Sequence, residues 1–160
     1  MKSSKGFSLI ELLIVVAIIL IIAAIAIPNL MRSKITANEA SAVSSLRSIN
    51  TAEATYQTTY PLVGFSCTLT ALGFGSGTVS STSAGLLDSS LSSGTKSGYS
   101  FNSISACTST NGIVGTYSWG AAPLAPGQTG ARYFCTTQSF TVQFSATDTA
   151  TCPANGSPIQ

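Results

Sequence analysis

The chain has 160 residues, enough for one modest domain with an extension, and its formal net charge is only +2. Charged residues make up 8% of the chain and histidine is absent, which removes the commonest general base and the commonest metal ligand. Apart from Lys2 and Lys5, five basic residues face five acidic ones, so no basic surface indicates nucleic acid. The composition therefore excludes a histidine-dependent enzyme and disfavours a nucleic-acid-binding protein.

An apolar run covers residues 12–27, with the sequence LLIVVAIILIIAAIAI. Extended back to Phe7, the run is interrupted only by Ser8 and Glu11. A helix of that length spans roughly 31 Å, about the thickness of a membrane hydrocarbon core. A helix buried in a soluble core is disfavoured, because the rest of the chain is too short and too polar to cover apolar residues on every face. The run therefore predicts a membrane-spanning helix.

An ordinary secretory signal peptide would show much of the same pattern, with Ala24 and Ala26 as small residues for a cleavage site. Two features speak against it. The run exceeds the usual length of about 7–15 residues, and the acidic Glu11 lies within it. Because Lys2 and Lys5 should stay in the cytoplasm, we expect a single pass with the carboxyl-terminal part outside.

Residues 5–12 read KGFSLIEL and lead directly into the aliphatic run. This segment resembles the prepilin motif of the type IV pilins, most closely that of type IVa major pilins. The resemblance implies that a membrane-embedded prepilin peptidase cuts between Gly6 and Phe7 and that the new terminus at Phe7 is N-methylated. A glycine suits the position before the cut, because a side chain there would crowd the backbone as it approaches the peptidase. The hydrophobic segment would then remain in the mature protein.

Glu11 is the acidic residue of the motif. A carboxylate at the centre of a membrane helix costs about 2.5–3.5 kcal/mol, and Glu11 lies nearer the end, roughly 6 Å from Phe7 along a helix. Acids within membrane segments are candidates for function. The partner we expect is the free amine of Phe7 that cleavage creates. That amine could belong to the same chain or, as the resemblance implies, to a neighbouring subunit, where the pair would set the subunit register; the sequence leaves both open.

Pro28 stands at the end of the apolar run. Proline lacks a backbone donor and crowds the carbonyl four residues earlier, so we expect a kink or local melting here rather than the end of the helix. The resemblance implies that pilin helices partly melt at such a proline in the assembled filament.

Residues 32–59 predict an amphipathic helix that Pro61 ends. Its apolar stripe consists of Ile35, Ala42, Leu46, Ile49, Tyr56 and Tyr60, and serines and threonines lie opposite. Glu53 falls on the apolar face, where its side chain either leans toward the edge of the stripe or contacts another subunit; we expect the former.

The remaining chain predicts a small antiparallel sheet after a Ser/Thr/Gly-rich connection over residues 62–97, in which residues 84–91 are a candidate short helix. The strand candidates are residues 99–104, 113–119, 131–136 and 140–144, and Pro123 and a turn at Pro126-Gly127 follow the second of them. Phe140, Val142 and Phe144 share one face, which we expect to pack on the apolar stripe. The predicted fold class is α+β: a long amino-terminal helix packed on a small antiparallel sheet, as in pilin heads.

The four cysteines are Cys67, Cys107, Cys135 and Cys152. They form no C-x-x-C pair, so a zinc or thioredoxin-like site is disfavoured, and an even number beyond a membrane segment favours two disulfides in an oxidising compartment. Three pairings are possible. We predict Cys67–Cys107 and Cys135–Cys152, of which the second resembles the disulfide-closed loop of pilins.

No catalytic or metal site is indicated. Without histidine no Ser/His/Asp group can form, and the two carboxylates beyond residue 60, Asp88 and Asp148, are too few for a calcium site. Lys96 is expected to be an ordinary loop lysine. We therefore expect neither an enzyme nor a cofactor.

The resemblance implies a structural subunit of a type IV pilus with four parts: a leader (residues 1–6), a transmembrane and filament-core segment (7–31), an amphipathic helix (32–60) and a head (61–160). The expected partners are other copies of the chain, the prepilin peptidase and N-methylase, the assembly platform with its ATPase, and membrane lipid before assembly.

The precursor is expected in a bacterial inner membrane and the mature protein in an extracellular filament. A pseudopilin of type II secretion is the nearest alternative, although such proteins typically hold calcium in an acidic loop that is absent here. A minor pilin that acts in adhesion or DNA uptake is another, which a basic or aromatic surface strip would favour.

Overall fold

The computed structural model describes residues 8–75, 77–150, 152 and 156–159. Its helices are α1 (Leu9–Thr59), α2 (Leu69–Leu72) and α3 (Ser89–Ser92). Its strands are β1 (Thr95–Lys96), β2 (Tyr99–Ser103), β3 (Thr108–Thr110), β4 (Ile113–Thr116), β5 (Ser118–Pro123), β6 (Tyr133–Thr137), β7 (Val142–Ser145) and β8 (Ser157–Pro158). The chain divides into two compact units, Met1–Lys34 and Ile35–Gln160.

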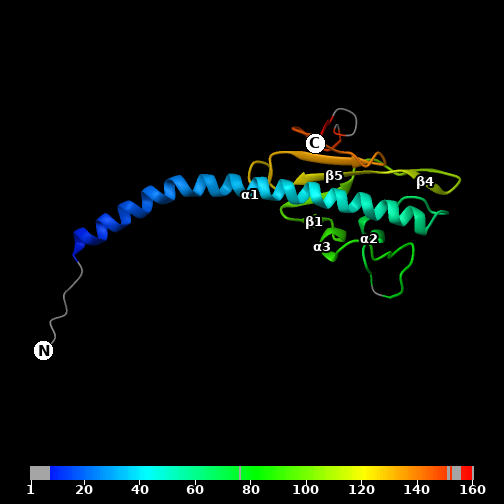
Figure 1. Cartoon of the computed structure of the whole chain (residues 1–160), viewed down its shortest axis with the longest axis horizontal. Coiled ribbons are helices and arrows are strands. Elements are labelled where there is room, and N and C mark those ends of the chain that lie inside the picture. Colours follow the sequence, from blue (N-terminus) through cyan, green and yellow to red (C-terminus); the bar gives the residue numbers. More distant parts are fainter. Residues whose placement is uncertain (1–7, 76, 151, 153–155, 160) are drawn as a thin grey trace. The chain divides into compact units, whose positions relative to one another are not determined.

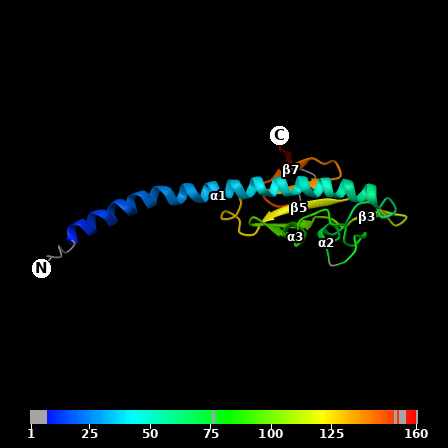
Figure 2. The ribbon, with the colours of Figure 1, turned by 60° about the horizontal axis from the view of Figure 1, so that its bottom comes forward.

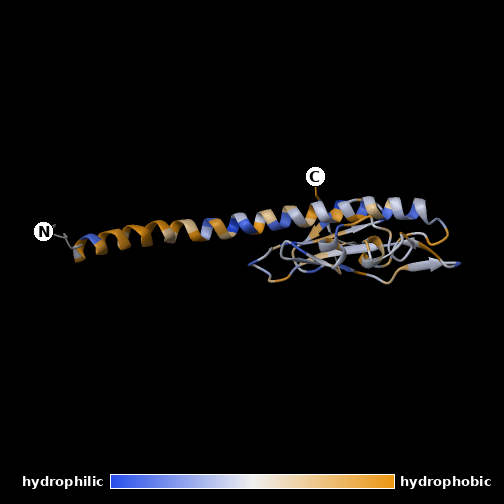
Figure 3. Cartoon of the chain, turned by 90° about the horizontal axis from the view of Figure 1, so that it is seen from below, coloured by the Kyte–Doolittle hydropathy of each residue, from blue (hydrophilic) through white to orange (hydrophobic). Residues whose placement is uncertain are grey.

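The first unit contains the apolar part of α1. Figure 3 shows this part as a nearly continuous hydrophobic stretch. Its large apolar side chains, from Leu9 to Met31, are exposed in the single chain. Within the described residues, α1 is the one helix with the length and hydropathy to cross a membrane. Pro28 lies inside the helix and does not end it.

In the second unit, the later part of α1 packs on an antiparallel sheet with the strand order β1-β2-β5-β6-β7-β8 (Figures 1 and 2). The strands β3 and β4 form a separate hairpin. The largest fully buried apolar side chains come from α1, from the short helices α2 and α3 and from the sheet: Leu46, Ile49, Leu72, Leu91, Tyr99, Phe101 and Phe134. The α+β prediction of a long helix on a small antiparallel sheet is therefore confirmed.

The segment predicted as one strand over residues 113–119 is divided between two sheets at Tyr117. Pro123 ends β5 opposite Tyr99. The backbone N–H of Leu124 points toward β2, since it donates to the Gly98 carbonyl at 2.9 Å. The position of Pro123 therefore faces the other side, where the pairing of β5 with β6 has already stopped at Ala121. A proline costs no ladder hydrogen bond there.

Phe140 does not share the buried face of β7, contrary to the prediction. It lies in the turn between β6 and β7 with φ 60° and is 47% exposed, whereas Val142 is buried. The Phe140 N–H donates to the Thr137 carbonyl at 2.9 Å within this turn, so Phe140 lies outside β7, and its ring centre lies 6.4 Å from that of Tyr117.

The connection between α1 and the sheet contains two one-turn helices, and the helix predicted over residues 84–91 was placed too early. α3 begins only after Asp88, whose carboxylate accepts a hydrogen bond from the Leu91 N–H at 2.8 Å. Gly85 has φ +68°, which interrupts a helix at that point. Leu72 of α2 and Leu91 of α3 are fully buried, so the connection is part of the core.

Candidate functional site

The start of α1 is closed by a capping pattern. The Ser8 backbone N–H donates to Glu11 Oε2 at 2.9 Å, and the Leu12 N–H donates to the Ser8 carbonyl at 3.2 Å. Ser8 and Glu11 therefore form half of a Ser-x-x-Glu capping box. The Ser-x-x-Glu spacing is visible in the sequence, but the sequence analysis considered Glu11 only as a partner for an amine and missed its capping role.

The Glu11 carboxylate contacts the backbone of Ser8, the residue that follows Phe7 in the sequence. Gly6 and Phe7, the residues of the expected cleavage and methylation, lie outside the described residues. Where the structure describes the chain, Glu11 has no ion pair, and its other oxygen has no hydrogen-bond partner. One carboxylate oxygen of Glu11 thus holds the start of its own helix.

The helix around Pro28 carries side chains that bond to backbone carbonyls. Asn29 Nδ2 donates to the Ile25 carbonyl at 3.1 Å, and Ser33 Oγ donates to the Asn29 carbonyl at 3.0 Å. The first bond lies beside the Ala24 carbonyl, to which Pro28 cannot donate, and the second lies one turn later. The helix is continuous here, and a kink or melting in a filament stays a prediction.

Further along α1, Asn50 is buried and joins the helix to the sheet. Its Nδ2 donates to Thr136 Oγ1 at 2.8 Å and to the Phe140 carbonyl at 3.2 Å. Its Oδ1 accepts from the Tyr117 hydroxyl at 3.0 Å. The contact with the Phe140 carbonyl helps to hold this aromatic residue in its left-handed conformation.

Glu39 holds the start of β6. Its Oε1 accepts from the backbone N–H groups of Ala131 and Arg132, at 3.0 and 3.2 Å, and its Oε2 lies 2.7 Å from Arg132 Nη2. The guanidinium carbon also lies 5.5 and 5.6 Å from the ring centres of Phe134 and Phe144. Burial alone would raise the pKa of Glu39, but the hydrogen bonds and the Arg132 charge outweigh it, and the pKa is lowered.

Glu53 is fully buried, so the prediction that it leans to the edge of the stripe was wrong. Its Oε1 accepts from Trp119 Nε1 at 2.8 Å, and its Oε2 accepts from the Ser66 N–H at 2.7 Å. Burial raises the pKa of Glu53 to about 7, against the opposite effect of these two hydrogen bonds. The misfit in the apolar pattern was a signal for a buried polar contact, since a buried carboxylate requires donors.

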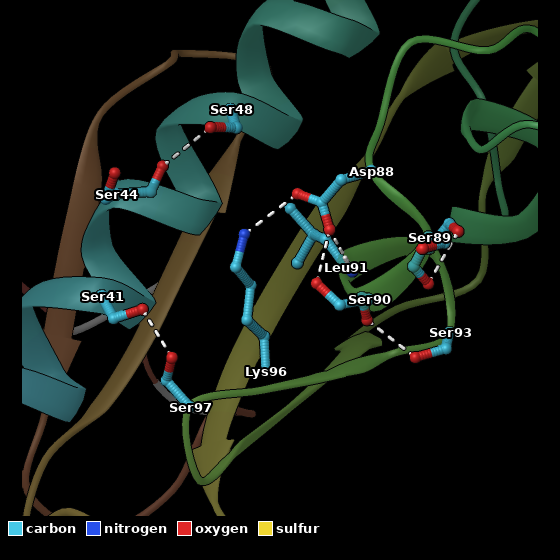
Figure 4. A network of polar contacts seen from close by, with 11 residues as sticks. Ser41, Ser44, Ser48, Asp88, Ser89, Ser90, Leu91, Ser93, Lys96 and Ser97 are labelled. Carbon is cyan, nitrogen blue, oxygen red and sulfur yellow. Dashed lines mark hydrogen bonds and ion pairs between the residues drawn. The ribbon is translucent and has the colours of Figure 1, made fainter.

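Lys96 is paired rather than free. Its Nζ lies 2.9 Å from Asp88 Oδ2 on the surface, and Ser41 Oγ of α1 donates to Ser97 Oγ at 2.9 Å (Figure 4). The hydrogen bond from Ser90, with further help from the Leu91 N–H and Lys96, lowers the pKa of Asp88. The described residues contain no cluster of metal-ligating side chains.

The structure joins Cys67 to Cys107 and Cys135 to Cys152. These are the expected pairs, and peptide mapping of the protein remains their test. The two disulfides differ in environment: Cys135 and Cys152 are completely buried, whereas Cys67 is exposed and Cys107 is half-buried.

The prokaryotic N-terminal methylation motif matches residues 1–27, which confirms the resemblance of this segment to prepilins. The chain is 59% identical over 39 residues to the type IV wide pilus major component PilA4 of Thermus thermophilus, and 45% identical over 53 residues to the type IV major pilin protein PilA of Myxococcus xanthus. These matches cover 24% and 33% of this chain and only 30% and 24% of the two relatives. No solved structure matches the chain.

Proposed function

We propose that the chain is a structural subunit of a type IV pilus, made as an inner-membrane precursor and polymerised through its amino-terminal helix. The observation that carries the proposal is the methylation motif over residues 1–27, together with a helix segment whose large apolar side chains, from Leu9 to Met31, are exposed in the single chain. Such a helix needs lipid or other copies of itself as its surroundings. Both curated relatives are named as major pilus components, which supports a main filament subunit over a pseudopilin.

Processing would proceed at the motif. A prepilin peptidase removes residues 1–6, and the new terminus at Phe7 is N-methylated. The segment over residues 7–31 stays with the mature protein. Residues 32–60 then continue the helix into the head formed by residues 61–160.

Assembly would transfer this apolar segment from lipid to the filament core. Burial stabilises by about 25 cal/mol per Å² only relative to water, so the gain between lipid and filament is smaller. Close packing and polar contacts then steer assembly. The work of extraction is assigned to the assembly platform and its ATPase, which are separate from this chain.

Glu11 would connect processing with assembly. Its Oε2 is held by the Ser8 N–H of its own helix, which orients the carboxylate. The other oxygen can then accept the Phe7 amine of a neighbouring subunit. Because that amine exists only after cleavage, only processed subunits would assemble in register.

The experiment that tests the proposal is the identification of the mature amino terminus. Sheared surface fibres should contain this protein, and mass spectrometry should find its terminus at Phe7 with one added methyl group. Gly6→Leu should abolish cleavage and leave the precursor in the membrane, whereas the matched control Ser3→Leu in the leader should be processed normally. A mature terminus near residue 25 would show an ordinary signal peptide and would refute the proposal.

A further inference from the structure

The two disulfides of the second unit differ in their access to solvent. Cys135–Cys152 lies in the core, with both residues fully buried. Cys67–Cys107 joins the connection after α1 to the segment between β2 and β3, and Cys67 is exposed. A thiolate must reach a sulfur atom to attack it. We therefore expect external thiols to reach Cys67–Cys107 and not Cys135–Cys152.

The exposed disulfide adjoins the buried carboxylate. Cys67 follows Ser66, whose backbone N–H donates to Glu53 Oε2. Trp119 Nε1 donates a hydrogen bond to the other carboxylate oxygen, Glu53 Oε1. The position of Ser66 therefore depends on how firmly the chain is held on each side of it.

On the side before Ser66, the backbone is held by β4. The Phe65 N–H donates to the Val114 carbonyl at 3.0 Å, and the Val114 N–H donates to the Val63 carbonyl at 2.8 Å. A side chain at Gly64 would collide with the Val114 carbonyl, so this approach requires glycine. On the side after Ser66, the covalent bond from Cys67 ties the chain to Cys107.

An open hollow of about 260 Å³ lies on this second side. Its lining includes Cys67, Thr68, Ser92, Phe101, Ser103 and Trp119. The indole of Trp119 thus contacts Glu53 through its Nε1 and also borders the hollow. A small movement of residues 66–68 would connect the hollow with the carboxylate.

We propose that Cys67–Cys107 is a reducible strap that keeps residues 66–68 closed over Glu53, so that its reduction admits water to this carboxylate while Cys135–Cys152 stays intact. In the reaction, one thiolate of a dithiol attacks the sulfur of Cys67, the exposed residue of the pair, and Cys107 leaves as a thiolate. The second thiol of the reductant then attacks the mixed disulfide and releases Cys67. Two electrons pass to the protein, and the dithiol becomes a cyclic disulfide.

The structure supplies its own reporter, since Trp119 is the single tryptophan of the chain and touches Glu53. The groups that face Glu53 are Trp119, the Ser66 amide, Tyr56 of α1 and Tyr117 between β4 and β5. The tyrosines stay neutral because burial, followed by the Glu53 charge, raises their pKa values. A change of Trp119 emission between pH 5 and pH 8 therefore reports the ionisation of Glu53.

The test uses the full chain in detergent micelles. Treatment with dithiothreitol, followed by iodoacetamide and peptide mapping, should label Cys67 and Cys107 at least about ten-fold faster than Cys135 and Cys152. The Trp119 emission should move to longer wavelength, and the midpoint of its pH titration should fall by about one unit or more, because water stabilises the ionised carboxylate. Far-ultraviolet circular dichroism should not change.

Two variants separate the strap from other effects. The double variant Cys67→Ser/Cys107→Ser should show the emission and midpoint of the reduced protein without reductant, and dithiothreitol should not change them further. Glu53→Gln should lose the titration and keep the labelling pattern. Equal labelling of all four cysteines, no labelling at all, an unchanged titration after reduction, or loss of the helical signal would each overturn the proposal.

Discussion

The helix α1 carries three carboxylates in two different surroundings. Glu11 lies in the apolar first unit, where its one hydrogen-bond partner in the described chain is the Ser8 N–H three residues away. Glu39 and Glu53 lie in the second unit, buried and bonded to partners 13 to 93 positions away. Burying a carboxylate costs free energy unless it is hydrogen-bonded, and in the second unit the fold supplies the donors to both buried carboxylates. The comparison teaches that the same residue type can cap its own helix in one part of α1 and hold tertiary structure in another; the assembly role proposed for Glu11 is the hypothesis that the first variant tests.

The largest effect is expected from Glu11, because one residue should decide assembly. Glu11→Val should insert into the membrane and be cleaved normally, since the cut site is untouched, yet fibre yield should fall sharply. Glu11→Gln is the matched control, because glutamine can keep the Ser8 capping bond without the charge. The measurement compares membrane-bound, processed and sheared-fibre protein. Normal fibre yield from Glu11→Val would contradict the inter-subunit role, and normal yield from Glu11→Gln alone would assign Glu11 to capping its own helix.

The next effect concerns the pH dependence of stability that Glu53 produces. Its pKa is raised from 4.5 to about 7 in the folded protein, so the folded state binds the proton more tightly. Stability from this group is therefore full below pH 4.5 and is lost as the pH rises toward 7, by roughly 3 kcal/mol. Denaturation of the full chain in micelles, followed by Trp119 emission, should show this slope, and Glu53→Gln should remove it. A rise in stability between pH 5 and pH 7 would refute the assignment.

Glu39 should show the opposite dependence and a smaller loss. Its lowered pKa means that stability from this group is present above pH 4.5 and lost as the pH falls below it. Glu39→Ala leaves the N–H groups of Ala131 and Arg132 without their acceptor, which should cost about 2 kcal/mol at neutral pH. The control Lys96→Ala breaks an exposed pair and should cost less than about 1 kcal/mol. Equal losses of stability in Glu39→Ala and Lys96→Ala would show that the buried Glu39 contributes no more than the exposed pair of Lys96 with Asp88.

The smallest effect is expected at Pro28, where α1 lacks one backbone hydrogen bond because proline has no N–H. Pro28→Ala restores a donor and removes a clash, so the helix should become stiffer while membrane insertion and cleavage continue. Fibre flexibility in electron micrographs should fall. Asn29→Ala is the control, since it deletes a side-chain bond to the Ile25 carbonyl without restoring a backbone donor. A straight, unbroken helix through residues 22–30 in filaments of the natural protein would exclude kinking or melting there.

The sequence analysis located the long helix and its end near Pro61. Both features depend only on neighbouring residues: the apolar run predicts the helix, and the proline ends it. It was less successful where long-range pairing decides. Residues 113–119 look like one strand by composition, but Tyr117 turns from the β3–β4 hairpin into the main sheet and binds Asn50. Phe140 fits an alternating pattern, yet it lies in the turn after β6 with a positive φ and stays half-exposed. Local alternation cannot reveal where a partner strand stops.

The sequence by itself determined the amino-terminal segment: its apolar length, its acid and its processing motif are contiguous, and hydropathy and helix capping need no distant contact. Only the tertiary structure decided which acids are buried and which disulfide is exposed. The donors to Glu53 are Ser66 and Trp119, and the acceptor for the start of β6 is Glu39, 92 positions before Ala131. Such partners meet only when α1 and the sheet pack together. The free energy of a buried carboxylate depends on those donors and on the exclusion of water. Neither can be read from the glutamate and its neighbours in the sequence.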